Sequence, residues 1–263
     1  MKIGVFLPSQ APGEIRASAR FAEEAGLDSV WATDHLVASG PILDSTVALA
    51  TAAAVTERIT IGYGVLLLAL RRVAVAAKQI SALQLVSAGR LAVGVGTGNP
   101  AHGDAGWRAA GTSFSGRGRR TDEALRVLPA LVTGRRAVLD DGLEVALAPG
   151  SAMPPVLVGG NGERAWLRAA QFGDGWISIG SSPEDVAAGL QALGDLAAGH
   201  GRPVPRATVV APALDGSPAK AAERLAAYAE AGAERVILAP GGEGWRPGYD
   251  FAAEVRAALG SRA

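Results

Sequence analysis

Asp34 and His35 are the neighbouring residues of this 263-residue sequence best suited to proton chemistry. They end the apolar run SVWATDH (29–35), and His35 is the only one of the three histidines directly beside an acid. An imidazole changes charge near neutral pH, so it can give or take a proton in a reaction. A buried strand that merely reaches solvent could end on the same two residues. The place of this run in the fold decides between the two interpretations.

A glycine-rich segment is the second candidate for chemistry. The run LVGGNGERA (157–165) passes from an apolar strand through Gly159, Gly160, Asn161 and Gly162 directly into a predicted helix. Free N–H groups and the helix dipole would then point at one spot, which predicts a site for an anion or a phosphate. A plain short turn is the alternative.

Other glycines would let the backbone come close to a flat ring. Gly64 lies inside an apolar run, and Gly96-Thr97-Gly98 ends another one. Tight packing of strands explains these glycines equally well. Pro240-Gly241-Gly242 is a weaker second candidate for an anion site, because no helix begins directly after it.

Eight apolar runs, each followed by a helical pattern, must position these residues. Their near-continuous apolar character is typical of parallel strands buried on both faces. Eight such units favour a closed (β/α)8 TIM barrel over an open sheet, with residues 1–263 forming a single domain. The predicted strands cover 3–8, 29–35, 59–68, 90–98, 154–160, 175–180, 207–214 and 234–240; the predicted helices cover 14–26, 44–57, 73–88, 121–133, 162–172, 183–199, 217–231 and 249–259.

Two segments depart from this alternation. Residues 99–120 form a long predicted loop at the end of strand 4, and residues 135–150 form a short predicted β-ribbon before strand 5, turning at Asp141-Gly142. The long loop carries His102, Trp107 and Phe114, which could line a substrate pocket. Packing inside the protein is the alternative role for the two aromatic residues.

Composition excludes several classes of function. Lys+Arg and Asp+Glu both number 25, and this zero net charge argues against a nucleic-acid-binding protein. The absence of cysteine excludes disulfides, thiolate zinc sites and cysteine nucleophiles. No uncharged apolar stretch reaches the roughly 18 residues that a membrane span needs, and the apolar run before Pro8 is too short for a signal peptide. We therefore expect a cytoplasmic protein.

The ends of the strands narrow the chemistry, because in a TIM barrel the active site gathers there. The chain has no H-x-H pair for a metallohydrolase, no strand-end lysine for a Schiff base and no carboxylate pair for a glycosidase. Asp34 is the one carboxylate found at a strand end, so we expect no metal site. An acid–histidine pair surrounded by glycine is better suited to hold a cofactor that carries the chemistry.

The sequence resembles the bacterial-luciferase-like superfamily of flavin- and deazaflavin-dependent barrels. The resemblance covers about residues 1–180 and looks closest to members that use coenzyme F420. The segments that carry it are EEAGLDSVWATDHL (23–36), the long stretch from ERITIGYG to LAVGVGTG (57–98), FSGRGRRTDEAL (114–125) and PPVLVGGNGERAWLRAAQFGDGWIS (154–178).

The resemblance implies roles for the residues after strands 2 and 3. Asp34 would contact the cofactor, and His35 would lie near its reacting carbon as the catalytic proton-transfer group. Gly64 and Val65 match a bulge, often containing a non-prolyl cis peptide, that presses on the back of the ring.

The same resemblance implies further cofactor contacts after strands 4 and 5. Thr97 and Gly98, with the adjacent Asn99, match positions beside the cofactor. Gly160 and Asn161, within the segment 159–162, match the contact with its phosphate tail.

The chain also departs from the deazaflavin-dependent sugar-phosphate dehydrogenases of this superfamily. Those enzymes have an acidic residue at Asn99, a tryptophan at Ser39 and a lysine at Ser181-Ser182. These differences argue against a phosphosugar. The predicted barrel mouth carries apolar residues, which indicates a less charged organic substrate: Leu67, Leu68, Trp107 and Phe114.

Three functions remain open at this point. The first is an F420-dependent oxidoreductase that transfers hydride to or from a small, fairly apolar organic molecule. The second is a two-component, FMN-dependent monooxygenase, and the third is a non-catalytic flavin-binding protein. The resemblance implies a separate reductase for the cofactor. It also allows a homodimer, because barrels of this family often dimerise.

Overall fold

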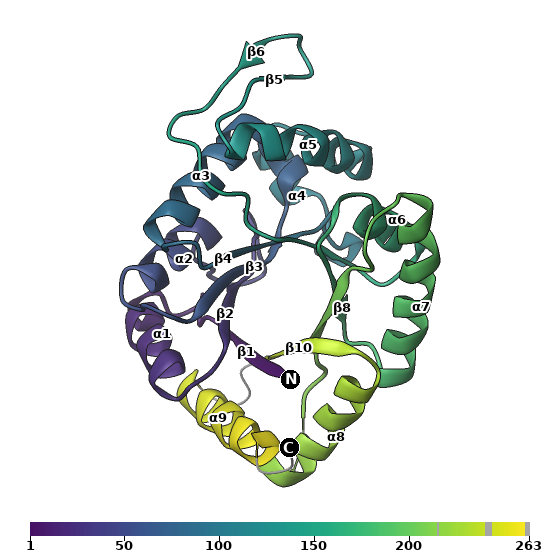
Figure 1. Cartoon of the computed structure of the whole chain (residues 1–263). Coiled ribbons are helices and arrows are strands. Elements are labelled where there is room, and N and C mark those ends of the chain that lie inside the picture. Colours follow the sequence, from purple (N-terminus) through teal and green to yellow (C-terminus); the bar gives the residue numbers. More distant parts are fainter. Residues whose placement is uncertain (215, 240–243, 261–263) are drawn as a thin grey trace.

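The computed structural model describes residues 1–214, 216–239 and 244–260 of the chain. Its long strands are β1 (Lys2–Phe6), β2 (Ser29–Ala32), β3 (Thr60–Leu66), β4 (Leu91–Val95), β7 (Val156–Gly159), β8 (Gly175–Ile179), β9 (Arg206–Val210) and β10 (Ala233–Leu238). They form a closed barrel in the order β1-β10-β9-β8-β7-β4-β3-β2, with every pair parallel. Helices surround this ring (Figure 1). The predicted TIM barrel is confirmed.

Helices alternate with the strands along the chain. The α-helices are α1 (Ile15–Glu24), α2 (Ser45–Ala53), α3 (Val73–Val86), α4 (Ala105–Ala109), α5 (Arg117–Val132), α6 (Glu163–Phe172), α7 (Pro183–Gly199), α8 (Pro218–Glu230) and α9 (Arg246–Gly260). Short 3-10 helices lie at η1 (Pro12–Glu14), η2 (Leu68–Leu70) and η3 (Pro100–His102). Among the described residues, no helix is long and apolar enough to cross a membrane.

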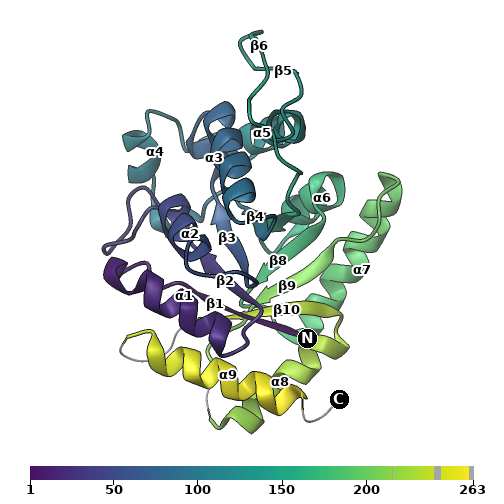
Figure 2. The same ribbon diagram turned by 60° about the vertical axis from the view of Figure 1, so that its left-hand side comes forward.

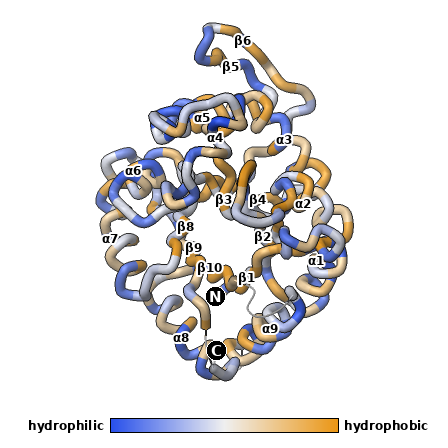
Figure 3. The backbone as a smooth tube through the Cα atoms, turned by 180° about the vertical axis from the view of Figure 1, so that it is seen from behind, coloured by the Kyte–Doolittle hydropathy of each residue, from blue (hydrophilic) through white to orange (hydrophobic). Residues whose placement is uncertain are grey.

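The main hydrophobic core lies between the barrel wall and the helices. Strand residues such as Ile3, Ile61 and Val93 are fully buried there, together with helix residues such as Leu128. Figure 3 shows the consequence for the sequence pattern: the strands are mostly hydrophobic along their length, while the helices alternate hydrophilic and hydrophobic segments. Parallel strands covered on both faces need no polar face, which is why their sequences lack period-2 alternation.

Trp31 fills much of the space inside the barrel. Its side chain is fully buried, and glycines on the two neighbouring strands leave room for it. A Cβ atom on Gly62 would lie 2.4 Å from the indole ring, and one on Gly4 would lie 2.9 Å from the indole nitrogen. The packing inside the barrel therefore requires glycine at positions 4 and 62, because the side chain of Trp31 fills the space beside them.

A small antiparallel hairpin follows α5 and projects outward from the helix layer beyond α3 and α5 (Figure 2). It consists of β5 (Ala137–Val138) and β6 (Glu144–Val145), and the chain turns at Gly142, whose φ is +83°. The predicted ribbon over 135–150 is confirmed, including its turn.

The predicted loop over 99–120 is shorter than expected and partly helical. It contains η3 and α4, and α5 begins at Arg117 rather than at residue 121. The charged residues at the start of α5 hide the helical periodicity in the sequence. In the structure Arg119 pairs with Glu123 one turn later, at 2.7 Å, which supports the helix from its solvent side.

Candidate active site

The predicted site residues lie at the C-terminal ends of four neighbouring strands. Asp34 and His35 follow β2, Gly64 and Val65 end β3, and Thr97-Gly98 follows β4. The glycine segment from Gly159 to Gly162 follows β7. Because β2, β3, β4 and β7 are consecutive in the barrel, the fold brings these four segments to one side of its mouth.

Asp34 is buried and forms the centre of a hydrogen-bond network. Its side chain accepts four hydrogen bonds: one from the N–H of Leu67 at 2.9 Å, one from the hydroxyl of Ser45 at 3.2 Å and two from the guanidinium of Arg71 at 2.7 and 2.9 Å. Burial alone would lower the pKa of Arg71, but the hydrogen bonds and charge of Asp34 outweigh burial and raise it. Asp34 thus joins the end of β2 to the segment after β3, and its direct contact with a cofactor stays a prediction.

Arg71 is a site residue that sequence reasoning missed. The Arg71-Arg72 pair precedes α3 and gave no sign of which side chain turns inward. A buried carboxylate needs a charged or hydrogen-bonding partner, so the position of Asp34 at the end of a buried strand was the available signal. The fold of the segment between β3 and α3 decides whether Arg71 or Arg72 pairs with Asp34. Arg72 instead lies 3.9 Å from Asp140 at the surface.

His35 lies half-buried beside His102, with the two ring centres 4.9 Å apart. Burial is the main cause that lowers the pKa of His35, the charge of His102 lowers it further, and Asp34 opposes them. This lowered pKa favours the neutral form of the imidazole, which is the form that can accept a proton. Of the loop residues predicted to meet a substrate, His102 is the one that the structure brings to His35.

The end of β3 forms the bulge that the resemblance implied. The Gly64–Val65 peptide is cis, and the pairing of β3 with β4 shifts between Tyr63 and Leu66. The side chain of Val65 turns into the barrel, where it takes space that side chains at Gly96 and Gly159 would occupy. Cβ atoms at these two glycines would lie 2.4 and 2.9 Å from it. These glycines therefore serve packing around Val65.

The loop after β4 covers one side of the mouth with aromatic side chains. Trp107 is buried, packs edge-on against Phe114 at 5.8 Å and belongs to an apolar cluster with Leu67 and Leu70. Gly98, with a φ of +82°, passes directly beneath Trp107. Arg117 stacks over Phe114 at 3.7 Å. The mouth therefore has an apolar wall next to the two histidines.

The segment between β7 and α6 has the form of an anion site. Gly160 has a φ of +132°, a conformation that favours glycine, and α6 begins at Glu163 without a side-chain cap. Among the described residues, no group accepts a hydrogen bond from the N–H groups of residues 161–164. Free N–H groups at the start of a helix fit a phosphate.

Asn161 and Asn99 are exposed, and both use their side chains for hydrogen bonds to the backbone of this chain. The amide of Asn161 pairs with the backbone of Ile179, accepting from its N–H at 2.9 Å and donating to its C=O at 2.5 Å. Asn99 is exposed and accepts from the N–H of Ala101 at 3.0 Å, which caps η3. Ser181 is buried and bonded to Ser178 at 2.5 Å, so it offers no charge in place of the lysine of the sugar-phosphate enzymes.

Two further predictions were a second anion site at residues 240–242 and the absence of a metal site. Pro240-Gly241-Gly242, the second candidate for an anion site, lies outside the described residues. Within residues 1–214, 216–239 and 244–260, no group of three histidine or acidic side chains could hold a metal ion.

Comparison with known proteins gives consistent matches. A model of the family described as luciferase-like monooxygenase matches residues 1–214. A 5,10-methylenetetrahydromethanopterin reductase of Methanolobus tindarius is 29% identical over 90% of this chain and 74% of its own length. An F420-dependent hydroxymycolic acid dehydrogenase of Mycobacterium tuberculosis is 31% identical over 68% of this chain and 54% of its own. The chain spans about half the length, 51%, of the first curated relatives it matches.

Solved structures give the same fold. An F420-dependent secondary alcohol dehydrogenase matches with a TM-score of 0.85 at 17% identity, over 98% of each chain. A monooxygenase of Streptomyces bottropensis also matches with a TM-score of 0.85, at 18% identity, over 100% of this chain and 99% of its own. At these identities the likeness establishes the barrel architecture and leaves the choice of reaction to the residues of the site.

Proposed function

Because the chain belongs to the luciferase-like monooxygenase family, we propose that it is an oxidoreductase that uses coenzyme F420 to transfer hydride to or from a small, fairly apolar organic substrate. The observation that carries the proposal is His35, which lies half-buried beside His102 of the loop after β4 and follows the strand next to the one that ends in the Val65 bulge. Relatives at about 30% identity whose names include F420 dependence support the choice of cofactor.

The residues at the mouth fit such a cofactor. The uncapped start of α6 could hold a phosphate, and the Val65 bulge presents an apolar surface on which a flat ring could rest. Coenzyme F420 supplies the hydride chemistry when bound, so the protein needs to bind, orient and move one proton. A protein that leaves hydride transfer to its cofactor needs few ionisable groups, and the candidate site contains few.

His35 would handle that proton. A neutral imidazole can accept a proton from a substrate hydroxyl as hydride leaves the carbon, and the protonated form returns it in the reverse direction. The Asp34–Arg71 pair would hold the segment after β3 at a fixed distance from His35. Trp107 and Phe114 would exclude water from the apolar side of the substrate.

An FMN-dependent monooxygenase is the second candidate. A monooxygenase of Streptomyces nodosus is 30% identical over 72% of this chain, and the same apolar mouth could admit reduced flavin and oxygen. His35 would then act as a base, and a separate reductase would supply reduced FMN. If the protein is an F420-dependent oxidoreductase, a separate enzyme would likewise return F420 to the oxidation state that the reaction uses.

A titration of the purified protein with F420 and with FMN separates the candidates. We expect F420 to bind with a Kd in the micromolar range and FMN to bind far more weakly. Binding of FMN without binding of F420 would contradict the proposal and favour the monooxygenase. Tight binding of either cofactor without turnover of any alcohol, ketone or oxygen-dependent substrate would favour a non-catalytic flavin-binding protein.

A further inference from the structure

A cavity of about 530 Å³ opens at the end of the barrel opposite the candidate active site. It is lined by the first residues of several strands, among them Lys2 of β1, Thr60 of β3 and Arg206 of β9. Its volume falls within the range of about 300–1,000 Å³ that is usual for small-molecule sites. None of the residues placed in the active site lines it.

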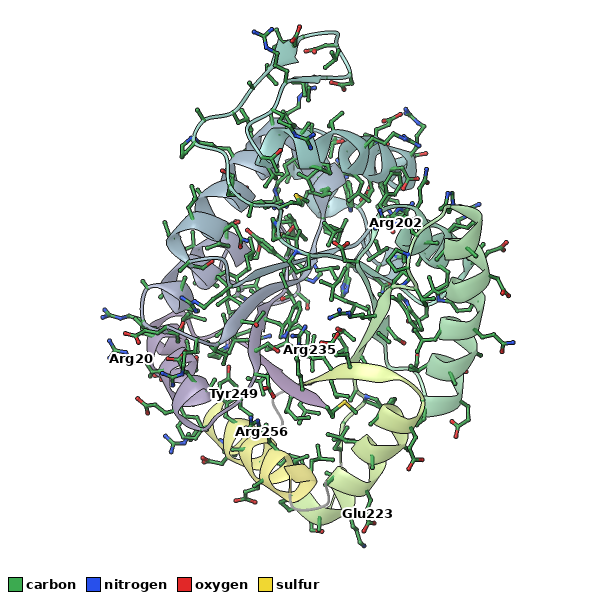
Figure 4. All side chains as sticks on the ribbon, viewed as in Figure 1. Arg20, Arg202, Glu223, Arg235, Tyr249 and Arg256 are labelled. Carbon is green, nitrogen blue, oxygen red and sulfur yellow. The ribbon has the colours of Figure 1, made fainter. Side chains whose placement is uncertain are left out.

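Arg235 on β10 lines this cavity, and no described residue forms a hydrogen bond or an ion pair with its side chain. Its side chain lies inside the barrel, 5.5 Å over the ring of Trp31, and Figure 4 shows its label near the middle of the ring of strands. The Nε atom is buried and unbonded, and no described residue forms a hydrogen bond or an ion pair with the guanidinium. Burial lowers the pKa of Arg235, against the charges of Glu234 and Asp28.

The nearby carboxylates are already engaged. Glu234 bonds Lys2 at 2.5 Å and lies 3.6 Å from Arg206, so it faces these two cations rather than Arg235. Asp174 lies 3.7 Å from Arg202. An arginine stays charged at every physiological pH, and a partly buried cation without a counter-charge is costly. Stacking on Trp31 holds the guanidinium by its face and leaves its in-plane N–H donors free.

We propose that this cavity is a binding site for a small organic anion whose carboxylate or phosphate pairs with Arg235. The lining supports an apolar body for that ligand, because apolar residues form much of the wall: Leu91, Ala92, Pro155, Leu157, Pro203 and Val204. Four cationic residues and two acidic ones line the cavity, so its charge also favours an anion. The proposal does not rest on the redox function, since it concerns the other end of the barrel.

The experiment compares three probes that share one ring: benzoate, phenyl phosphate and benzamide. Thermal unfolding and isothermal titration calorimetry are measured at constant ionic strength. We expect at least one anion to raise Tm by about 5–10 °C at roughly 100 times its Kd, and neutral benzamide to have no such effect. A response to benzoate alone assigns a carboxylate ligand, and a response to phenyl phosphate alone assigns a phosphate.

Variants locate the binding. Arg235→Met should weaken anion binding by at least about tenfold, the usual worth of a charge-assisted hydrogen bond. Arg20→Met removes the same charge from the outer face of α1 and should bind like the wild type (Figure 4). Glu234→Gln should bind the anion several-fold more tightly, because it removes a negative charge and frees Lys2 and Arg206. This variant keeps the test decisive if Arg235→Met does not fold.

Three results would overturn the proposal. The first is an anion response no larger than that of benzamide. The second is a response that survives in Arg235→Met, since it would come from the start of α6 or from the barrel mouth. The third is weaker anion binding in Glu234→Gln.

Discussion

Asp34 joins two consecutive strand ends through one buried ion pair with Arg71. Replacement of the carboxylate in Asp34→Asn would leave the guanidinium without its charge partner. We expect a loss of about 2–4 kcal/mol in the free energy of unfolding, below the top of the range for buried pairs because the Arg71 side chain is 21% exposed. Urea unfolding measures this value.

Asp140→Asn is the matched control for that variant. Asp140 lies 3.9 Å from Arg72, and both side chains are more than three-quarters exposed. An exposed pair contributes little, so the control should stay within about 0.5 kcal/mol of the wild type. Equal losses in the two variants would mean that burial of the Asp34–Arg71 pair contributes nothing.

His35 is the residue whose removal tests the proposed chemistry. His35→Ala should keep cofactor binding and lose turnover by about 10²–10⁴-fold, the usual contribution of a general acid–base. Cofactor Kd and kcat are measured on the same preparation. An unchanged kcat with intact binding would remove His35 from the mechanism.

His102 should shift the pH range in which His35 works, in addition to the larger effect of burial. Its charge lowers the pKa of His35, so His102→Ala should raise that pKa. In the direction where His35 accepts the proton, activity falls as pH drops below its pKa, because the imidazole becomes charged. The acidic limb of the kcat/KM profile should therefore move to higher pH in His102→Ala. A limb that stays in place, or moves to lower pH, would contradict the coupling between the two rings.

Strands β2 and β3 depend on each other through the contact of Trp31 with Gly62. Gly62→Ala places a methyl group 2.4 Å from an indole that is fully buried and cannot move away. We expect a loss of about 1–3 kcal/mol in the free energy of unfolding, as is usual for an overpacked core. Gly13→Ala is the control, because no described atom lies within 4 Å of a Cβ at that position.

A double-mutant cycle identifies the cause of that loss. Trp31→Phe in the Gly62→Ala background should cost less than in the wild type, since the smaller ring makes room for the methyl group. Additive losses would mean that the alanine acts on the backbone of β3 instead.

At the level of elements, the sequence predicted what depends on local pattern and missed what depends on distant partners. Continuous apolar runs predicted the eight strands, and the Asp141-Gly142 pair predicted the hairpin turn. In the structure Gly142 has the positive φ that such a turn needs. The start of α5 at Arg117 was missed because its first turn is all polar or glycine. Arg71 was missed because its partner Asp34 lies 37 residues earlier and the pairing requires the folded loop.

At the level of the whole molecule, the barrel separates two candidate sites. Side chains of Trp31, Leu157, Ile177 and Ile237 form a buried cluster inside the barrel, between its two ends. Sites that share no residue usually act independently, with free energies that add to within about 0.3–0.5 kcal/mol. We therefore expect the Kd for F420 to change less than about twofold when benzoate saturates the opposite cavity.

This last prediction rests on both proposed sites, and its controls separate them. If benzoate weakens F420 binding equally in the wild type and in Arg235→Met, it competes at the barrel mouth and the two ends remain independent. If the change is larger than twofold and is lost in Arg235→Met, the interior cluster transmits binding from one end to the other. Such a coupling must be reciprocal, so F420 would then change the Kd for benzoate by the same factor. Calorimetric titration of each ligand in the presence of the other measures both directions.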